Sequence, residues 1–265
     1  MIPVAIRETG VPEGLVAIPV RTRLIAPGDD LTVLVREAIH GIARPGDVVV
    51  IAETAVAIAQ SRFIPAEFIR PSPLALALSR RAGALATVSQ PESLQLVIDQ
   101  AGTPKVLWAA FAHVVGKLRG KTGAFYEILG QEIATIDGYT GTLPPYERAI
   151  VLGPAEPDRV SRELGDALGV HVAIVDANDL RRAKTLGASN AIDRAAVERA
   201  LIGNPHGNGD EQTPIVVLAW RGAGPHPLVV PNDAPSDVTQ SAPHPDVTQS
   251  APHPDVTLSL SKGEP

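Results

Sequence analysis

The chain has 265 residues, which is enough for one large domain or two small ones with a substantial core. It contains no cysteine, and this excludes disulfides, thiolate metal sites and a cysteine nucleophile. The formal net charge of -6, without a basic stripe, argues against a nucleic-acid-binding protein. The hydrophobic fraction of 45% indicates a globular chain.

The N-terminus, residues 1–8, lacks the basic start and long apolar core of a signal peptide. No stretch approaches the roughly 18 apolar residues that a membrane-spanning helix needs. We therefore expect a cytoplasmic protein that does not contact a membrane.

The first half of the chain predicts a helix, a strand and a second helix in succession. Gly28-Asp29-Asp30 forms a turn and N-cap ahead of residues 31–42, whose apolar side chains recur at helical spacing. Pro45-Gly46 then turns the chain into Val48–Ile51, a β-branched run typical of a buried strand. Residues Glu53–Gln60 are predicted to form a helix near the end of that strand.

The middle of the chain predicts helices followed by strands. The helices are expected at Leu74–Ala84 and Pro91–Ile98. Strands are expected at Val106–Phe111, Ala124–Leu129 and Glu132–Ile136. The gap of two residues at 130–131 has the length of a hairpin turn, so the last two strands should be antiparallel.

The second half alternates strands and helices more regularly. Pro157–Leu168 has an amphipathic helical pattern that ends at Gly169. A strand at Val170–Val175, a helix at Ala191–Ile202 and a strand at Ile215–Trp220 follow. This order predicts a βαβ unit with a parallel pair, and the whole chain is expected to be an α/β protein with mixed sheets.

The C-terminal part differs in composition from the rest. The segment Asp237–Pro245 is repeated as Asp246–Pro254, and a third copy begins at Asp255. These copies hold little apolar surface with which to offset the entropy of ordering. The sequence thus predicts a folded domain at residues 1–223 and a disordered Pro/Ser-rich tail at residues 224–265.

An acidic segment, Asp176-Ala177-Asn178-Asp179, directly follows a predicted strand and is expected to be a loop. In open α/β sheets, ligands gather beyond the carboxyl ends of strands. A carboxylate at such a place is a hard oxygen ligand that suits Mg²⁺ or Mn²⁺. Alternatively, Asp176 or Asp179 caps the next helix, and spacing alone does not decide between the two.

Two further acidic segments could contribute metal ligands. Asp137 lies in an Asp-Gly pair after a predicted strand, where an ordinary turn is the alternative. Gly207 and Gly209 would let the backbone approach a ligand, and Asp210 could complete a metal shell. A polar connection between a helix and a strand explains the same residues equally well.

The densest basic cluster consists of Lys117, Arg119 and Lys121, ahead of a predicted strand. It could bind phosphate groups, and a solvated turn is the alternative. His113 lies in an apolar stretch and is expected to be a core histidine with its hydrogen bonds satisfied. The sequence contains neither a Walker A loop nor a GxGxxG pattern after a strand.

Taken in order, these segments resemble the coenzyme F420-0:L-glutamate ligase (F420-0 gamma-glutamyl ligase) family over about residues 14–220. The resemblance rests on the ordered set of segments and on no single motif. The segments are Thr22-Arg23-Leu24-Ile25, Pro27–Leu31, Gly46–Ile51, Ala59-Gln60-Ser61-Arg62, Asp137, Val175-Asp176-Ala177-Asn178, Gly207–Glu211 and Pro214–Val217.

The resemblance implies a two-lobed, non-Rossmann α/β fold and a homodimer. It implies a GTP-dependent acid–amino-acid ligase that uses Mg²⁺ or Mn²⁺ and joins L-glutamate to an acid acceptor through a gamma-glutamyl amide bond. The expected metal ligands are Asp137, Asp176 and Asp210. The residues expected to bind nucleotide or substrate are Arg23, Arg62, Lys117, Arg119, Lys121, Asn178, Gly207 and Gly209.

The sequence also departs from the family pattern. Two lysines that the family carries in the helix after the first strand are replaced by Thr54 and Ile58, and a Gly-Arg pair is replaced by Asp179-Leu180. Loss of fixed cations should weaken triphosphate binding. Two alternatives therefore stand beside the ligase: a non-catalytic protein that binds a nucleotide or phosphometabolite on the same scaffold, and a structural partner whose acidic segments are only caps.

Overall fold

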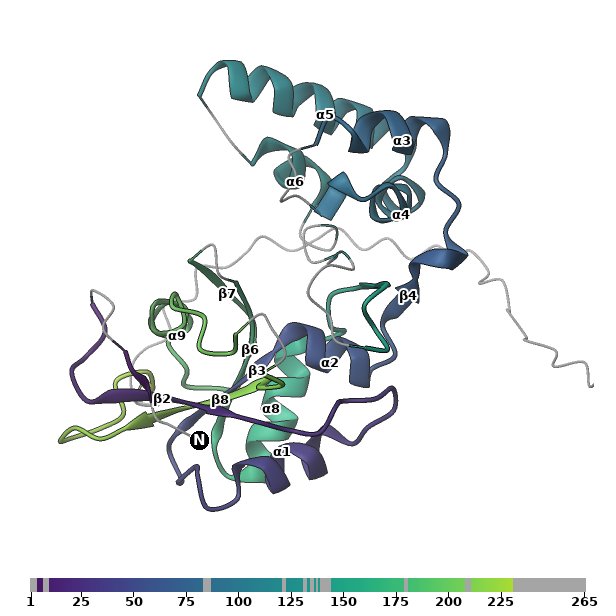
Figure 1. Cartoon of the computed structure of the whole chain (residues 1–265). Coiled ribbons are helices and arrows are strands. Elements are labelled where there is room, and N and C mark those ends of the chain that lie inside the picture. Colours follow the sequence, from purple (N-terminus) through teal and green to yellow (C-terminus); the bar gives the residue numbers. More distant parts are fainter. Residues whose placement is uncertain are drawn as a thin grey trace, which may run out of the picture. The chain divides into compact units, whose positions relative to one another are not determined.

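The computed structural model describes residues 4–6, 10–82, 87–120, 123–130, 133, 136, 138, 144–178, 181–207 and 211–230. All of these residues fall within one unit, Met1–Asn232, and Figure 1 labels its helices and strands. The unit is a mixed α/β structure, which confirms the fold class expected from the sequence.

The N-terminal and C-terminal parts of the chain together form a six-stranded mixed sheet. Its strand order is β1-β2-β8-β3-β6-β7. Its only parallel pair among the described strands is β3 with β6, and the other neighbours are antiparallel. A second, two-stranded antiparallel sheet pairs β4 with β5. The strands are β1 (Val4–Ala5), β2 (Leu15–Val20), β3 (Val48–Ala52), β4 (Phe63–Pro65), β5 (Ala149–Val151), β6 (His171–Asn178), β7 (Arg182–Ala188) and β8 (Ile215–Trp220).

In chain order, all of the described helices lie between β2 and β8. They are α1 (Leu31–Ile39), α2 (Glu53–Ala59), α3 (Pro73–Ser79), α4 (Pro91–Ala101), α5 (Thr103–Leu118), α6 (Ala124–Leu129), α8 (Pro157–Leu168) and α9 (Arg194–Ala200), with 3-10 turns at Ala66–Phe68 and Thr87–Ser89. Asp30 caps α1, since its carboxylate accepts from the backbone N–H groups of Thr32 and Val33, as the sequence predicted.

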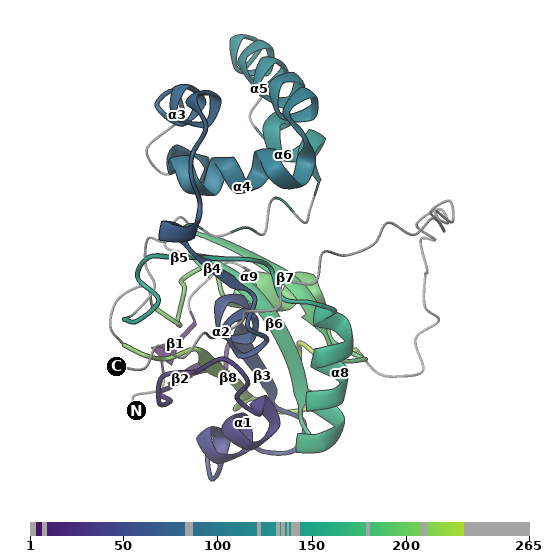
Figure 2. The same cartoon turned by 90° about the vertical axis from the view of Figure 1, so that its right-hand side faces the viewer.

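Both faces of the large sheet are covered (Figure 2). Alternate residues of β3 enter different cores: Val49 and Ile51 pack with α1, α2 and α8, whereas Val48 and Val50 pack with α9. A strand buried on both sides must be apolar throughout, which is why β3 is a continuous β-branched run. Helices α3–α6 contribute to a third core cluster, together with residues that include Ile150 of β5.

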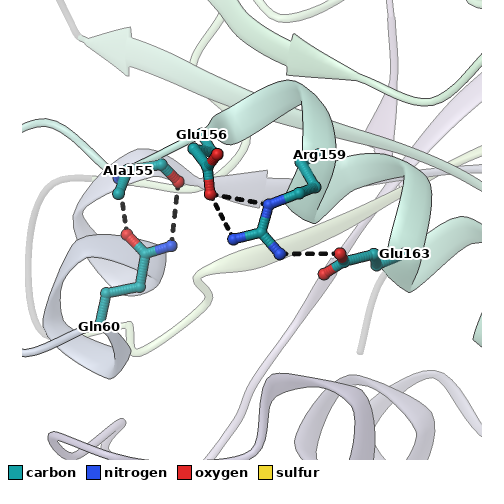
Figure 3. A network of polar contacts seen from close by, with 5 residues as sticks. All are labelled: Gln60, Ala155, Glu156, Arg159 and Glu163. Atoms are coloured by element: carbon teal, nitrogen blue, oxygen red, sulfur yellow. Dashed lines mark hydrogen bonds and ion pairs between the residues drawn. The ribbon is translucent and has the colours of Figure 1, made fainter.

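A pair of polar contacts fixes the start of α8 beside the end of α2 (Figure 3). The Gln60 side chain donates to the Ala155 carbonyl at 3.1 Å and accepts from the Ala155 N–H at 2.7 Å. Glu156 adopts a left-handed conformation, with φ of 45°, and its carboxylate accepts from Arg159 Nε at 2.7 Å. Arg159 also donates to Glu163 at 2.8 Å. Since α8 leads directly into β6, these contacts help to set where β6 begins.

The middle of the chain contradicts the strand predictions. Val106–Phe111 lies within α5, and Ala124–Leu129 forms α6, so the antiparallel hairpin expected there is also wrong. Only Ile133 and Ile136 of the third expected strand are described, and Ile133 is helical. The aromatic and β-branched composition suggested strands, but Val106 and Ala109 are buried three residues apart, which is helical spacing.

Other predictions need correction as well. Helix α3 ends at Ser79, and α9 covers only the centre of the expected Ala191–Ile202 helix. The predicted βαβ unit is wrong, because β6 and β8 are not neighbours and β3 lies between them. The sheet core also continues past residue 223: Leu228 is buried, and Val229 forms a β-bridge with Ile192. Residues 231–265 of the predicted tail lie outside the described residues.

Candidate functional site

A cavity of about 620 Å³ lies at the hairpin formed by β6 and β7 and at the neighbouring helix α9. Strands β6 and β7, with Arg181 just before β7, supply most of its polar side chains, and α9 supplies the others. The lining residues are Asp176, Asn178, Arg181, Arg182, Ala183, Lys184, Ala195, Glu198, Arg199 and Ile202.

The acidic segment is part of a strand, not the loop expected from the sequence. Asp176 pairs with Lys184, and Asn178 pairs with Arg182, in the antiparallel register of β6 and β7. Directly opposed residues of two strands have neighbouring side chains on the same face. The register therefore places a cation opposite each of the two polar side chains of β6.

Alternation along β6 exposes these polar side chains at the end of a buried strand. Val175 and Ala177 pack into the core beside α9, and Ile174 packs into the core on the opposite face. Asp176 and Asn178 lie at the end of β6, beyond its apolar part, and line the cavity together with residues of β7 and α9. Both are half-buried.

The charge around the cavity is mostly positive. Arg181, Arg182, Lys184 and Arg199 line it and are exposed, against the two carboxylates of Asp176 and Glu198. Lys184 Nζ lies 3.7 Å from Glu198 Oε1, which is a long ion pair. In a chain of net charge -6, this local excess of cations favours an anionic ligand.

The carboxyl group of Asp176 lies in a poorly solvated position. Burial raises the pKa of Asp176 above its ordinary value. A carboxylate that has lost water and has not replaced all of its hydrogen bonds is stabilised when a cation or a hydrogen-bond donor binds to it. Perturbed carboxyl groups in cavities are more frequent at functional sites than elsewhere, and Asp176 meets that description.

The structure brings together two of the residues that the sequence nominated, Asp176 and Asn178. Lys117 and Arg119 lie at the end of α5 and just after it, with exposed side chains, and the cavity lining does not include them. They lie at the end of a helix, and the next described element is helix α6, not the expected strand. Lys121 lies outside the described residues.

Two nominated arginines have roles within the fold. Arg23 forms a bidentate ion pair with Asp29, at 2.6 and 2.8 Å, and lowers the pKa of that carboxyl group. Arg62 donates from Nε to the Gly153 carbonyl at 2.6 Å, which ties the start of β4 to the chain leaving β5.

Gly207 occupies a turn that needs glycine. Its φ is 75°, and a Cβ at this position would lie 2.8 Å from the Glu211 carboxylate. The neighbouring candidates Gly209 and Asp210 lie outside the described residues, as does Asp137. Among the residues that the structure does describe, no group of three or more histidine, aspartate or glutamate side chains is arranged to hold a metal ion.

The histidine in the apolar stretch departs from its expected role. His113 is half-buried on α5, and its Nδ1 atom has no hydrogen-bond partner within the described part of the chain. It is therefore not the satisfied core histidine that the sequence suggested.

The cations of the cavity are the residues that sequence reasoning missed. Arg181, Arg182 and Lys184 place three cations within four residues, a denser run than residues 117–121, and the run begins two residues after Asp179, so the signal was present. Arg199 gave no signal, since only the packing of α9 places it here. At the two family lysine positions, Ile58 is buried in the core and Thr54 is half-buried.

No helix in the described ranges combines the length and apolar character required to cross a bilayer.

Comparison with known proteins identifies relatives of one kind. The chain is 28% identical over 157 residues to a protein of Methanopyrus kandleri named coenzyme F420:L-glutamate ligase. The aligned part is 58% of this chain and 54% of that protein, so the chain spans about half the length of this curated relative. The sequence profile of F420-0:gamma-glutamyl ligase matches residues 19–190. Because that match covers more than half of the chain, the protein belongs to the F420-0:gamma-glutamyl ligase family.

Proposed function

We propose that the protein is an acid–amino-acid ligase that uses GTP and Mg²⁺ or Mn²⁺ to join L-glutamate to an acid acceptor through a gamma-glutamyl amide bond. One observation carries the proposal. Within the stretch that matches the family, Asp176 and Asn178 line a cavity with excess positive charge. A nucleotide, glutamate and an acceptor acid are all anions, and such a cavity favours them.

The proposed reaction has two steps. An oxygen of the acceptor carboxylate attacks the γ-phosphorus of GTP, and the bond to the β-phosphate oxygen breaks, which gives an acyl phosphate and GDP. The amino nitrogen of glutamate then attacks the acyl carbon, phosphate leaves, and the nitrogen loses a proton. The new amide is a gamma-glutamyl bond where the activated carboxylate is the γ-carboxylate of a glutamyl group on the acceptor. Arginine side chains around the cavity would stabilise the negative charge of the transferred group and orient the reactants.

Whether the cavity suits a divalent cation depends on the oxygen atoms that would bind it. Asp176 is a hard oxygen donor whose desolvation a bound cation would offset, and so it suits Mg²⁺ or Mn²⁺. We assign Asp176 to the metal, with Asp137 and Asp210 as the further ligands that the sequence suggests. When bound, the ion would withdraw charge from the phosphate oxygens.

The test is glutamate-dependent turnover of GTP. With purified full-length protein, Mg²⁺ or Mn²⁺ and candidate acceptor acids that include F420-0, GDP and phosphate should be released only when both acceptor and glutamate are present. Asp176→Asn should lower kcat/KM by roughly two orders of magnitude or more, because it removes a charged ligand and keeps the shape.

A matched control is Asp166→Asn, an exposed carboxylate on α8 outside the cavity lining. It should leave turnover unchanged. Full turnover by Asp176→Asn would show that this carboxylate has no part in the reaction, and absence of glutamate-dependent turnover with every acceptor would contradict the ligase.

The second candidate is a non-catalytic protein that binds a nucleotide or phosphometabolite. The observation that favours it is Ile58, whose side chain fills the core at a position where the family has a lysine. This candidate predicts that nucleotides with Mg²⁺ raise the melting temperature without any turnover. A thermal-shift series with nucleotides and either metal separates it from a structural partner, for which no ligand would change the melting temperature.

The proposal includes a homodimer and, because GTP is consumed, a cytoplasmic location. Support for association comes from one side of α5, where Leu107, Trp108, Phe111 and Val114 are 45–60% exposed. The Trp108 and Phe111 rings are neighbours, with centroids 5.8 Å apart. A two-fold interface would cover this apolar surface on both copies at once. Sedimentation equilibrium checks the expected dimer mass.

A further inference from the structure

The outer wall of the cavity is built from β7 and α9 and carries guanidinium groups without counterions. Arg182 and Arg199 are both exposed, and neither side chain has a hydrogen-bond or ion-pair partner among the described residues. Exposed arginines are common, but here two of them line one cavity with Arg181 and Lys184. The like charges of Arg182 and Arg199 repel each other, and an anion bound in the cavity would relieve that repulsion.

The carboxylate on this wall is already engaged. Glu198 Oε1 accepts from the Thr185 N–H at 2.8 Å and lies 3.7 Å from Lys184 Nζ. These contacts fasten α9 to β7 and use part of the negative charge of Glu198. Arg182 and Arg199 therefore remain available to a ligand, and Glu198 helps to hold the two elements that carry them.

The position of Arg199 is restrained by its surroundings. It lies on α9 between Val197 and Ala200 of one core, both fully or almost fully buried, so the helix is held against the sheet. Its stem also lies near Gly10, where an added Cβ would be 3.8 Å from Arg199 Cδ. Residue 199 falls outside the stretch that matches the family, so the match does not account for this cation.

We propose that Arg182 and Arg199 select a ligand that carries at least two negative charges, as phosphate or carboxylate groups, in addition to any carboxylate that reacts. Guanidinium groups bind both kinds of anion through paired, charge-assisted hydrogen bonds. As a statement about the acceptor substrate this rests on the proposed ligase function. As a statement about anion binding it stands on the cavity alone.

The test measures binding of two simple probes to the full-length protein by titration calorimetry: inorganic pyrophosphate for phosphate groups and citrate for carboxylate groups. Wild-type protein should bind at least one of them, and more weakly as salt rises. Binding of pyrophosphate alone would show that the wall selects phosphate groups, and binding of citrate alone would show that it selects carboxylate groups. Binding of both would show that it recognises negative charge of either kind. Failure of both probes to bind would overturn the proposal.

Variants then locate the binding. Arg182→Ala and Arg199→Ala should each weaken binding of the probe by about tenfold, which corresponds to about 1.4 kcal/mol, since each removes a charge-assisted hydrogen bond. The doubly lysine-substituted protein, Arg182→Lys with Arg199→Lys, should bind better than the double alanine variant, because the charge remains while the fork geometry is lost. Wild-type affinity in the double alanine variant would overturn the proposal.

The control is Arg70→Ala, an exposed arginine outside the cavity lining. It should bind the probe like wild type, and an equal loss here would show that only overall charge matters. The outcome is separable from the ligase proposal. If the alanine variants lose probe binding but the wild-type protein shows no glutamate-dependent turnover, the anion site is retained and the ligase is rejected. If the wild-type protein shows turnover but the variants bind the probe as it does, the ligase is retained and the anion site is rejected.

Discussion

At the scale of single residues, the imidazole of His206 has a strongly lowered pKa. It lies in the turn after α9 and is buried, and its Nδ1 lies 3.1 Å from the Thr213 carbonyl. Because a carbonyl only accepts, Nδ1 carries the proton of the neutral ring. Nε2 has no partner within the described residues. Burial lowers the pKa of His206 to about 4 from its ordinary 6.5.

This pKa predicts an acid-sensitive contribution to stability. The unfolded chain binds a proton near pH 6.5 and the folded chain only near pH 4, so stability from His206 is complete above pH 6.5 and falls as the pH drops toward 4. The full fall corresponds to about 3 kcal/mol. We expect His206→Gln, which keeps a donor but does not titrate, to flatten urea-unfolding stability between pH 6.5 and 4. An unchanged pH slope in that variant would contradict the assignment.

At the scale of elements, β7 lies very close to the start of α8. A Cβ on Gly187 would lie 2.3 Å from the backbone carbonyl of Pro157, so no side chain fits there. The next residue, Ala188, donates its N–H to Asp158 Oδ1 at 3.0 Å. Asp158 also pairs with Arg194 at the start of α9. One aspartate therefore connects α8, β7 and α9, the last two of which form the cationic wall.

Gly187→Ala should separate β7 from α8. Two backbone atoms cannot yield as a flexible side chain would, so we expect a loss of roughly 1–3 kcal/mol in the free energy of unfolding. Because β7 carries Arg182 and Lys184, pyrophosphate binding should weaken in the same variant. Chemical denaturation and calorimetry check the two effects, and wild-type stability would show that β7 shifts at no cost.

At the scale of the whole molecule, the residues after β8 complete the core on the α9 side of the sheet. Leu228 is 1% exposed and packs with Val197 and Leu201. His226 Nε2 lies 3.0 Å from the Leu218 carbonyl, and the N–H of Leu228 donates to Nδ1 of the same ring at 3.3 Å. The segment thus closes one side of the core, past the boundary expected at residue 223.

Two truncations test this closure. A chain that ends at residue 223 loses Leu228 from the core, and we expect it to lose about 2–5 kcal/mol of stability. A chain that ends at residue 232 keeps every described residue and should unfold at the same denaturant midpoint as the full chain. Equal stability of the two truncated chains would show that the segment contributes nothing. For residues 231–265, the disordered tail stays a prediction.

Local sequence patterns were sufficient to predict an element where a single interaction determines it. Val48–Ile51 is a strand because four β-branched residues in a row can be buried on both sides only in a central strand. Asp30 and Gly169 bound α1 and α8 through a side-chain cap and a left-handed residue, both of which the sequence shows directly. In α5, the same β-branched and aromatic residues form a helix, since packing of Val106 and Ala109 into the third core outweighs local propensity.

The sequence by itself determined the family-like order of segments and the absence of thiol chemistry, and it nominated Asp176 and Asn178 as candidate site residues. Only the tertiary structure decided that these two residues lie in a strand, because the β6–β7 register is set by the pairing of two segments and by burial of Val175 and Ala177. It also decided which cations surround them. Arg199 reaches the cavity because α9 packs its apolar side on the sheet, and no spacing along the chain encodes that contact.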